Sequence, residues 1–180
     1  MNKISFSNRG FTLFEVLAAI FIIGTLSTVI LLNYRVGQEQ AVLTRAAAAF
    51  ETEIRKAQNL AISSPEFGGA IPCGYGIYYT DNRNFSIFAG QLGGALSCNV
   101  SNHNFESGID SVYQNLKIIE PGVVFKNSFS DIFFEPPDPA TYINNSKAVG
   151  VSTTVELCLE TDLTKCRNLT IDTAGRISIQ

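Results

Sequence analysis

The stretch RGFTLFEVLAAIFIIGTLSTVILL, residues 9–32, joins a basic start to an apolar run that contains one carboxylate. No charged residue occurs in residues 16–32. As a helix, residues 11–32 would extend about 33 Å, which matches the hydrocarbon thickness of a bilayer. We therefore expect these residues to span a membrane. Glu15 is the exception within the run, because a carboxylate in a membrane helix is costly unless it finds a partner.

The helical pattern continues beyond the apolar run. One face carries apolar side chains at alternating steps of four and three residues: Leu43, Ala47, Phe50, Ile54, Ala57 and Ala61. This spacing is typical of an amphipathic helix that packs on a protein core. Pro65 ends the pattern, because the residue before a proline is disfavoured in helical geometry. We expect one helix over residues 11 to about 62, whose second half is amphipathic.

From Cys73 onward the sequence changes to short β-type runs separated by turns. Eight runs favour strands, at residues 74–80, 85–89, 116–120, 123–128, 131–135, 153–160, 167–172 and 176–180. Residues 91–110 and 136–149, which are rich in Gly, Ser, Asn and Pro, are typical of long loops. The predicted fold class is α+β, with a long N-terminal helix packed on a mostly antiparallel sheet domain. The expected core pairs Phe50 and Ile54 with residues such as Ile77, Phe88, Phe133 and Leu157.

Four cysteines lie beyond the apolar run: Cys73, Cys98, Cys158 and Cys166. An even number in a part of the chain expected outside the cytoplasm favours two disulfides. Seven residues separate Cys158 from Cys166, which suits a bridged hairpin, and Cys73 then pairs with Cys98 by elimination. A metal site is the alternative, but the CxxC spacing is missing and only His103 would be available to assist.

The run RG-FTLFEV, followed by an uninterrupted apolar segment, resembles the processing site of type IV pilins and type II secretion pseudopilins. The resemblance implies that a prepilin peptidase cleaves between Gly10 and Phe11 and methylates the new amino group of Phe11. It also implies that Glu15 neutralises a terminal amine, usually that of a neighbouring subunit. Such a pair is physically favourable, because a cation beside the carboxylate stabilises both charges away from water. Gly24 lies where helices of this family loosen during filament assembly.

The C-terminal end carries a second similarity. CRNLTIDTAGRISIQ, residues 166–180, resembles the closing hairpin of GspH/FimT-type pseudopilins and minor pilins, and AFETEIRKAQNLAIS, residues 49–63, is similar to the helix end of that branch. Many major subunits have a proline where this chain has Leu32. Both features favour a minor subunit.

The resemblance implies a structural protein without catalytic residues or cofactors. Its expected parts are a cleaved leader (1–10), a transmembrane assembly helix (11–32), an amphipathic helix half (33–63) and an extracytoplasmic β-rich domain (64–180). The implied location is the bacterial inner membrane, crossed once, and then a pilus or pseudopilus filament. The implied partners are sister subunits, the prepilin peptidase, a membrane platform protein, an assembly ATPase and the lipid itself.

Other chemistry has little support in the sequence. A His-based catalytic triad would depend on His103, which lies in a loop-like context. Asp131, Glu135 and Asp138 are carboxylates of the kind that bind calcium, but they form no EF-hand pattern, so we expect no metal.

Nucleic-acid binding is the main alternative function, since minor pilins of the FimT type bind DNA through basic residues near the C-terminus. The corresponding residues here are Lys165, Arg167 and Arg176. Residues 64–180 contain seven Lys/Arg against twelve Asp/Glu, so a nucleic-acid partner is not expected. A signal-anchored extracytoplasmic protein that forms no filament is the other alternative.

Overall fold

A computed structural model of the chain describes residues 12–92, 98, 102–137 and 140–180. At positions 29 and 31–33 it describes the backbone alone. The chain divides into two compact units, Met1–Gln40 and Ala41–Gln180. Helix α1 (Leu13–Ser63) contributes to both. The expected cleavage position between Gly10 and Phe11 lies outside the described residues.

Helix α1 ends where the sequence predicts. The amide of Ser64 still donates to the carbonyl of Leu60 at 2.8 Å, and its hydroxyl donates to the carbonyl of Ala61 at 2.9 Å. Ser64 itself has left helical geometry, with φ at 43°, and Pro65 follows. The last turn therefore satisfies two of its carbonyls through one residue, as helix ends require.

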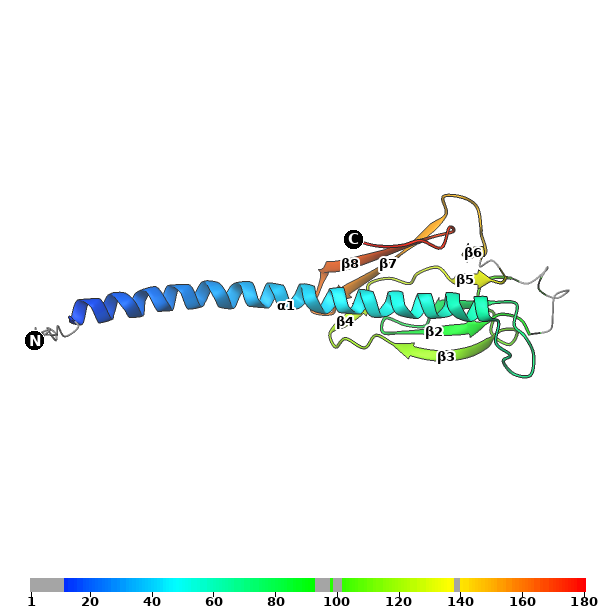
Figure 1. Cartoon of the computed structure of the whole chain (residues 1–180), viewed down its shortest axis with the longest axis horizontal. Helices are drawn as coiled ribbons and strands as arrows, with labels where there is room; N and C mark the ends of the chain where they lie inside the picture. The colour runs from blue at the N-terminus through cyan, green and yellow to red at the C-terminus, as the bar shows by residue number, and fades with distance from the viewer. Residues whose placement is uncertain (1–11, 93–97, 99–101, 138–139) are drawn as a thin grey trace, which may run out of the picture. The chain divides into compact units, whose positions relative to one another are not determined.

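The second unit contains two antiparallel sheets. The first has the strand order β3-β2-β1-β5-β6 and consists of β1 (Tyr75–Tyr79), β2 (Asn84–Ala89), β3 (Ser111–Lys117), β5 (Ile132–Glu135) and β6 (Ala140–Ile143). The second has the order β4-β7-β8-β9 and consists of β4 (Val123–Phe125), β7 (Ser152–Leu159), β8 (Asp162–Asp172) and β9 (Ile177–Ile179). Figure 1 shows strands of both sheets alongside the C-terminal part of α1. The predicted α+β class, a helix packed on antiparallel sheets, is confirmed.

The core forms where the amphipathic face of α1 meets both sheets. All six residues predicted for this face are buried. The aromatic ring of Phe50 contacts Phe85 of the first sheet and Phe125 of the second, with ring centroids 4.9 and 5.4 Å away. Ile54 and Leu157 are fully buried in the same cluster. Each such apolar side chain stabilises the fold by about 1.5–3 kcal/mol relative to its exposed state.

Two residues assigned to that core lie elsewhere. Phe88 and Phe133 pack with Tyr142 in a separate cluster, because successive strand residues point to opposite faces of a sheet. Their neighbours Ile87 and Phe134 face the main core instead. The main-core assignment of Phe88 and Phe133 was therefore wrong, although both side chains are buried.

Glycines make the second cluster possible. A Cβ on Gly76 would lie 2.5 Å from the ring of Phe88, and a Cβ on Gly74 would lie 2.6 Å from the ring of Phe133. Both positions need glycine because the rings lie directly over the backbone of β1 and the residue before it.

Two strand predictions need correction. The strand predicted at residues 116–120 is β3 at Ser111–Lys117, and β6 lies within residues predicted as a long loop. Both strands are the edges of the first sheet. Edge strands need less apolar sequence than central strands, so SVYQNLK and ATYI give weak patterns.

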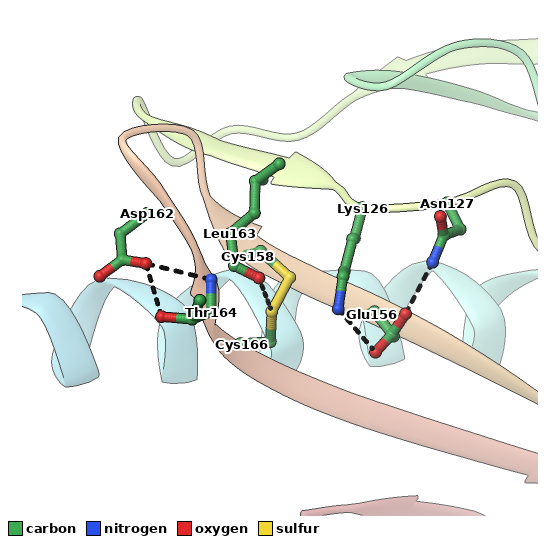
Figure 2. The surroundings of a disulfide bond; sticks show 8 residues. All are labelled: Lys126, Asn127, Glu156, Cys158, Asp162, Leu163, Thr164 and Cys166. Atoms are coloured by element: carbon green, nitrogen blue, oxygen red, sulfur yellow. Dashed lines mark hydrogen bonds and ion pairs between the residues drawn. A yellow bond between two sulfur atoms is a disulfide. The ribbon is translucent and has the colours of Figure 1, made fainter.

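Two disulfides join residues within the second unit. Cys158 and Cys166 are opposite each other in the β7–β8 hairpin, with their Cα atoms 4.0 Å apart (Figure 2). Cys73 pairs with Cys98, with Cα atoms 5.2 Å apart. This is the pairing favoured by the spacing of the four cysteines.

Candidate functional site

The carboxylate of Glu15 lies at the start of α1 and binds the residue before the helix. Its Oε2 accepts hydrogen bonds from the backbone amide and the hydroxyl of Thr12, both at 2.9 Å. In return, the amide of Glu15 donates to the hydroxyl oxygen of Thr12 at 3.3 Å. This reciprocal arrangement is a capping box, which satisfies amides that a helix start leaves unpaired. Thr12 was not among the predicted site residues, although the pattern Thr-x-x-Glu before an apolar run is a sequence signal for it.

The first part of α1 presents apolar side chains to its surroundings. Leu13 and Phe14 are 82% and 79% exposed. Other large exposed side chains follow along the helix: Val16, Leu17, Ile20, Phe21, Ile22, Ile23, Leu26 and Ile30. Contiguous apolar surface of this extent marks a site of association with protein or lipid.

Gly24 lies within this apolar part of the helix. A Cβ added at Gly24 would meet no atom within 4 Å. The carbonyl of Gly24 accepts a hydrogen bond from the hydroxyl of Thr28 at 2.9 Å, and Thr25 donates to Ile22 in a similar way. Both hydroxyls are thus satisfied within the helix, so their polarity costs little in apolar surroundings.

Across the described residues, no helix combines the length and apolarity that crossing a membrane requires. The span expected at residues 11–32 stays a prediction.

The acidic residues considered for calcium make separate hydrogen bonds. The carboxylate of Asp131 accepts from the amide of Phe105 at 2.9 Å, and that of Glu135 accepts from the hydroxyl of Tyr142 at 2.7 Å. Asp138 lies outside the described residues. In the part of the chain that the structure describes, no group of three or more His, Cys, Asp or Glu residues is arranged to hold a metal ion.

The basic residues considered for DNA binding all have partners within the chain. Arg176 lies 2.8 Å from the carboxylate of Asp172, and Lys165 lies 3.9 Å from that of Asp162. Arg167 donates to the hydroxyl of Thr44 at 3.3 Å. Two of the three cations thus lie beside carboxylates, which lowers the positive field available to a phosphate backbone.

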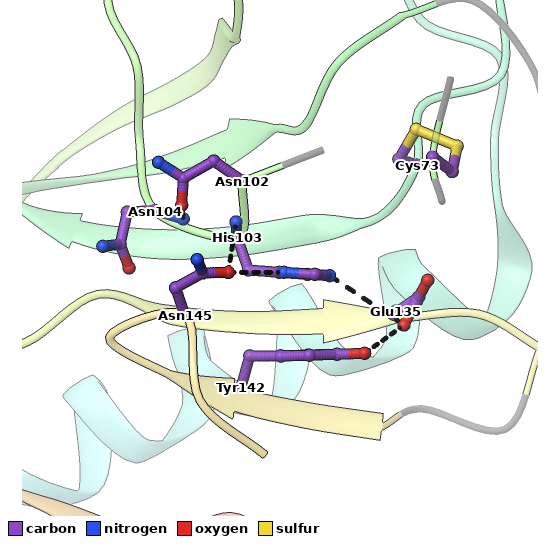
Figure 3. A network of polar contacts seen from close by, with 8 residues as sticks. Cys73, Asn102, His103, Asn104, Glu135, Tyr142 and Asn145 are labelled. Atoms are coloured by element: carbon purple, nitrogen blue, oxygen red, sulfur yellow. Dashed lines mark hydrogen bonds and ion pairs between the residues drawn. A yellow bond between two sulfur atoms is a disulfide. The ribbon is translucent and has the colours of Figure 1, made fainter. Parts of the chain in front are cut away.

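His103 does not lie in a purely solvated loop. Figure 3 shows its ring within a polar network that includes Glu135, Tyr142 and Asn145 from the β5–β6 hairpin and its flank. The network contains no cysteine thiol or serine beside the imidazole among the contacts of His103. It ties the segment before β3 to the first sheet.

Comparison with known proteins supports the interpretation of the N-terminal segment as a processing motif. Residues 5–31 match the family model described as the prokaryotic N-terminal methylation motif. This match confirms the motif on which the resemblance to type IV pilins and pseudopilins rests.

A solved structure with some similarity is the crystal structure of the type IV minor pilin FimU from Pseudomonas aeruginosa strain PAO1. It is 16% identical in sequence, the alignment covers 79% of this chain and 90% of that one, and the TM-score is 0.47. No functionally curated protein is significantly similar in sequence.

Proposed function

We propose that this chain is a structural subunit, of the minor type, in a type IV pilus or a type II secretion pseudopilus. The observation that carries the proposal is the methylation motif at residues 5–31, which includes the first part of α1, where large apolar side chains are exposed. The last part of the same helix carries the disulfide-bonded β domain. The apolar first part of α1 is suited to association with other helices, and the β domain is suited to form the surface of a filament.

Processing would create the partner that Glu15 needs. Hydrolysis of the peptide bond between Gly10 and Phe11 would leave a carboxylate on Gly10 and a free amino group on Phe11. Transfer of one methyl group from a methyl donor to that nitrogen would then give a secondary amine, which remains a cation at neutral pH. In the uncleaved chain, Glu15 is bound by Thr12. The carboxylate is therefore already positioned at the helix start, where a terminal amine from a neighbouring subunit would bind it. An ion pair of this kind sets the register of adjacent helices, because either charge alone is costly in apolar surroundings.

The helix around Gly24 would tolerate loosening during packing. Glycine lowers helix propensity by about 1 kcal/mol relative to alanine. Leu32 occupies the position where many major subunits have proline, and unlike proline it has a backbone N–H that can donate within a helix. This difference and the GspH/FimT-like end support a minor role.

The proposed location follows from the same segment. The apolar residues 11–32 would insert in the inner membrane with Lys3 and Arg9 on the cytoplasmic side, because positively charged residues that flank a membrane helix are enriched on that side. The cysteine-containing domain would then face the oxidising side, where disulfides persist. Prepilin peptidase, the platform protein, the assembly ATPase and sister subunits are the partners in this proposal.

Incorporation into filaments tests the proposal. The full chain would be produced together with a complete pilus or pseudopilus assembly system, and sheared filaments would be probed for it. We expect the wild type in the filament fraction, the Glu15→Gln variant only in membranes, and the matched control Glu66→Gln in filaments. Absence of the processed wild type from filaments would contradict the filament role. Equal incorporation of Glu15→Gln would contradict the role of the carboxylate.

The DNA-binding alternative predicts a different result. A salt-dependent gel shift that disappears when Arg167 and Arg176 are replaced would favour it. The contacts of Arg176 with Asp172 and of Lys165 with Asp162 lead us to expect no such shift.

A further inference from the structure

Strand β3 is an edge of the first sheet, and the direction of its outer backbone groups follows from its pairing. Among the described residues, β3 pairs with β2 alone. Just beyond the strand, the amide of Ile118 donates to the carbonyl of Arg83, which precedes β2, at 2.9 Å. Residues of an antiparallel strand alternate between backbone groups that face the neighbour and groups that face away, so Leu116 also faces β2. The backbone amides and carbonyls of Asn115 and Lys117 therefore point to the open edge.

Strand β9 is an edge of the second sheet and has the same arrangement. In the part of the chain that the structure describes, it pairs with β8 alone. Just beyond β9, Gln180 and Asn168 exchange two backbone hydrogen bonds, at 2.9 and 3.1 Å. The same alternation directs the backbone groups of Ile177 and Ile179 away from β8. Each of the two edges thus presents two residues, two positions apart, whose backbone groups point outward.

Strand β3 runs antiparallel to the part of α1 beside it. Near its start, Gln114 accepts a hydrogen bond from the ammonium group of Lys56. Beyond its end, the carboxylate of Glu120 lies 2.9 Å from the guanidinium of Arg45, three turns earlier in the helix. The arrow of β3 accordingly points back toward the middle of α1 (Figure 1).

Strand β9 runs in the same direction as β3. A Cβ on Gly175, in the turn before β9, would lie 3.2 Å from the side-chain nitrogen of Gln58. The other end of β9 pairs with the part of β8 that follows Arg167, whose guanidinium donates to the hydroxyl of Thr44 at 3.3 Å. Both edge strands are therefore antiparallel to α1. When residues 41–63 of two copies are parallel, β3 of one copy and β9 of the other are parallel too.

An apolar groove lies between α1 and the edge of β3. Its volume is 430 Å³, and its lining includes four apolar residues, Ala46, Ala49, Leu116 and Ile118. In a parallel pair of strands, a residue whose backbone faces the neighbour lies opposite one whose backbone faces away. Ile177 and Ile179 of a second copy would therefore lie on the same face as Leu116, beside the groove. Ile179 is 39% exposed, so its side chain is available to cover the groove.

We propose that β9 of a second copy of this chain pairs in parallel with the open edge of β3, so that Ile179 covers the groove. The inference rests on the proposed function, because a filament or a membrane holds the helices of neighbouring copies parallel. Ile177 and Leu116 each pack against the main core of their own domain, so both helices lie on one side of the joined sheet. The contact joins two different edges, which leaves one of each kind open and lets the contact repeat along a filament.

Cysteine cross-linking of the full chain in membranes tests the contact. Two versions with different tags, Lys117→Cys and Ser178→Cys, are produced together and treated with a thiol reagent about 8 Å long, because paired strands place such positions about 5–8 Å apart. The four native cysteines are in disulfides, so only the new thiols react. We expect a product with both tags. Absence of this product would overturn the proposal.

A matched control excludes random collisions. Thr154→Cys replaces Ser178→Cys and places an exposed thiol on the same face of the second sheet, two strands beyond β9. This position lies about 10 Å further from β3, so the reagent should not reach it. An equal yield from the two pairs would overturn the proposal.

A variant of β3 tests the backbone pairing itself. Asn115→Pro, added to the Lys117→Cys version, removes an amide at the open edge and no hydrogen bond to β2, a position where edge strands tolerate proline. The cross-linked product should fall about fivefold, as loss of one backbone hydrogen bond predicts. Asn115→Ala also loses the side-chain contact with Ser86 but keeps the amide, so it should retain the product. Equal yields from the two variants would overturn the proposal. If Asn115→Pro does not fold, Ile179→Asp replaces it, and a yield unchanged by that charge would overturn the proposal equally.

The filament fraction separates this proposal from the proposed function. Processed wild type in filaments, with no cross-linked product from the cysteine pair, would overturn the strand contact and leave the filament role intact. Absence of the processed wild type from filaments would contradict the filament role, and the product in membranes would still decide whether the strand contact forms.

Discussion

Phe50 of α1 lies edge-on against Phe85 of the first sheet, with ring centroids 4.9 Å apart and 79° between the ring planes. The same ring contacts Phe125 of the second sheet at 5.4 Å and Phe129 at 5.6 Å. Edge-to-face contacts add to the stabilisation that burial alone gives. One helix residue therefore joins both sheets into one core.

Replacing Phe50 with alanine should destabilise the β domain more than any change on the exposed helix face. We expect the free energy of unfolding to fall by about 3–5 kcal/mol, because the change leaves a cavity bounded by both sheets. Chemical denaturation followed by circular dichroism measures it. Thr52→Ala, on the exposed side of the same helix, is the control and should have little effect; equal losses would contradict the central position of Phe50.

Gly76→Ala should also be destabilising. The new Cβ would lie 2.5 Å from the ring of Phe88 and 2.7 Å from the carbonyl oxygen of Ile132, and the latter belongs to the backbone and cannot move freely. Overpacking of this kind costs about 1–3 kcal/mol. Gly37→Ala, where a Cβ meets no atom within 4 Å, is the matched control and should be tolerated. A melting temperature unchanged in Gly76→Ala would refute the close packing of this cluster.

The two disulfides should contribute unequally to stability. Cys73–Cys98 spans a sequence separation of 25, and Cys158–Cys166 spans 8. Since a disulfide restricts the unfolded chain more when it closes a longer loop, removing Cys73–Cys98 should cost about 1 kcal/mol more. Paired serine variants compared by denaturation give the difference. The reverse order would show that local strand pairing, rather than loop closure, dominates.

Asp131 should make stability depend on pH. Burial raises the pKa of Asp131 above its ordinary value of 3.8, and burial likewise raises that of Asp110. The folded chain then binds these protons more tightly than the unfolded chain. The contribution of these two carboxyl groups to the free energy of unfolding is present below the ordinary pKa and is lost as pH rises through the raised pKa. Asp131→Asn should flatten this part of the stability profile, and an unchanged profile would contradict it.

The pKa of Asp81 is shifted in the opposite direction to that of Asp131, so Asp81 serves as a control for the pH dependence of stability. Hydrogen bonds from the side chain of Asn84 and the backbone of Arg83 hold the pKa of Asp81 below its ordinary value. Its contribution is therefore present above the ordinary pKa and is lost as pH falls through the lowered one. In Asp81→Asn, the free energy of unfolding should therefore fall less at acidic pH than it does in the wild type. The same denaturation series measures this difference.

The sequence was most informative where one strong pattern determined the outcome. The positions of Leu43 and Ile54 on one helical face identified the buried side of α1, because a period near 3.6 residues has one structural meaning. The spacing of Cys158 and Cys166 likewise indicated a hairpin, and the two residues are opposite each other in the β7–β8 ladder.

The sequence was less informative where tertiary context decides. Phe88 and Phe133 are as apolar as any core residue, but strand parity and the glycines opposite place them in a second cluster. Edge strand β6 gave no clear pattern because only four residues pair with β5. The network around His103 joins residues 42 positions apart, so no local pattern could indicate it.

The most direct test of the proposed function is the intact mass and N-terminal peptide of the full chain, produced with a prepilin peptidase and analysed under non-reducing conditions. We expect a mature chain that begins with N-methylated Phe11 and lacks four hydrogens for two disulfides, while Gly10→Ala stays uncleaved. A chain that still begins at Met1 with an active peptidase, or one cut beyond residue 32, would contradict a pilin-like subunit. It would favour an anchored or secreted β domain that forms no filament.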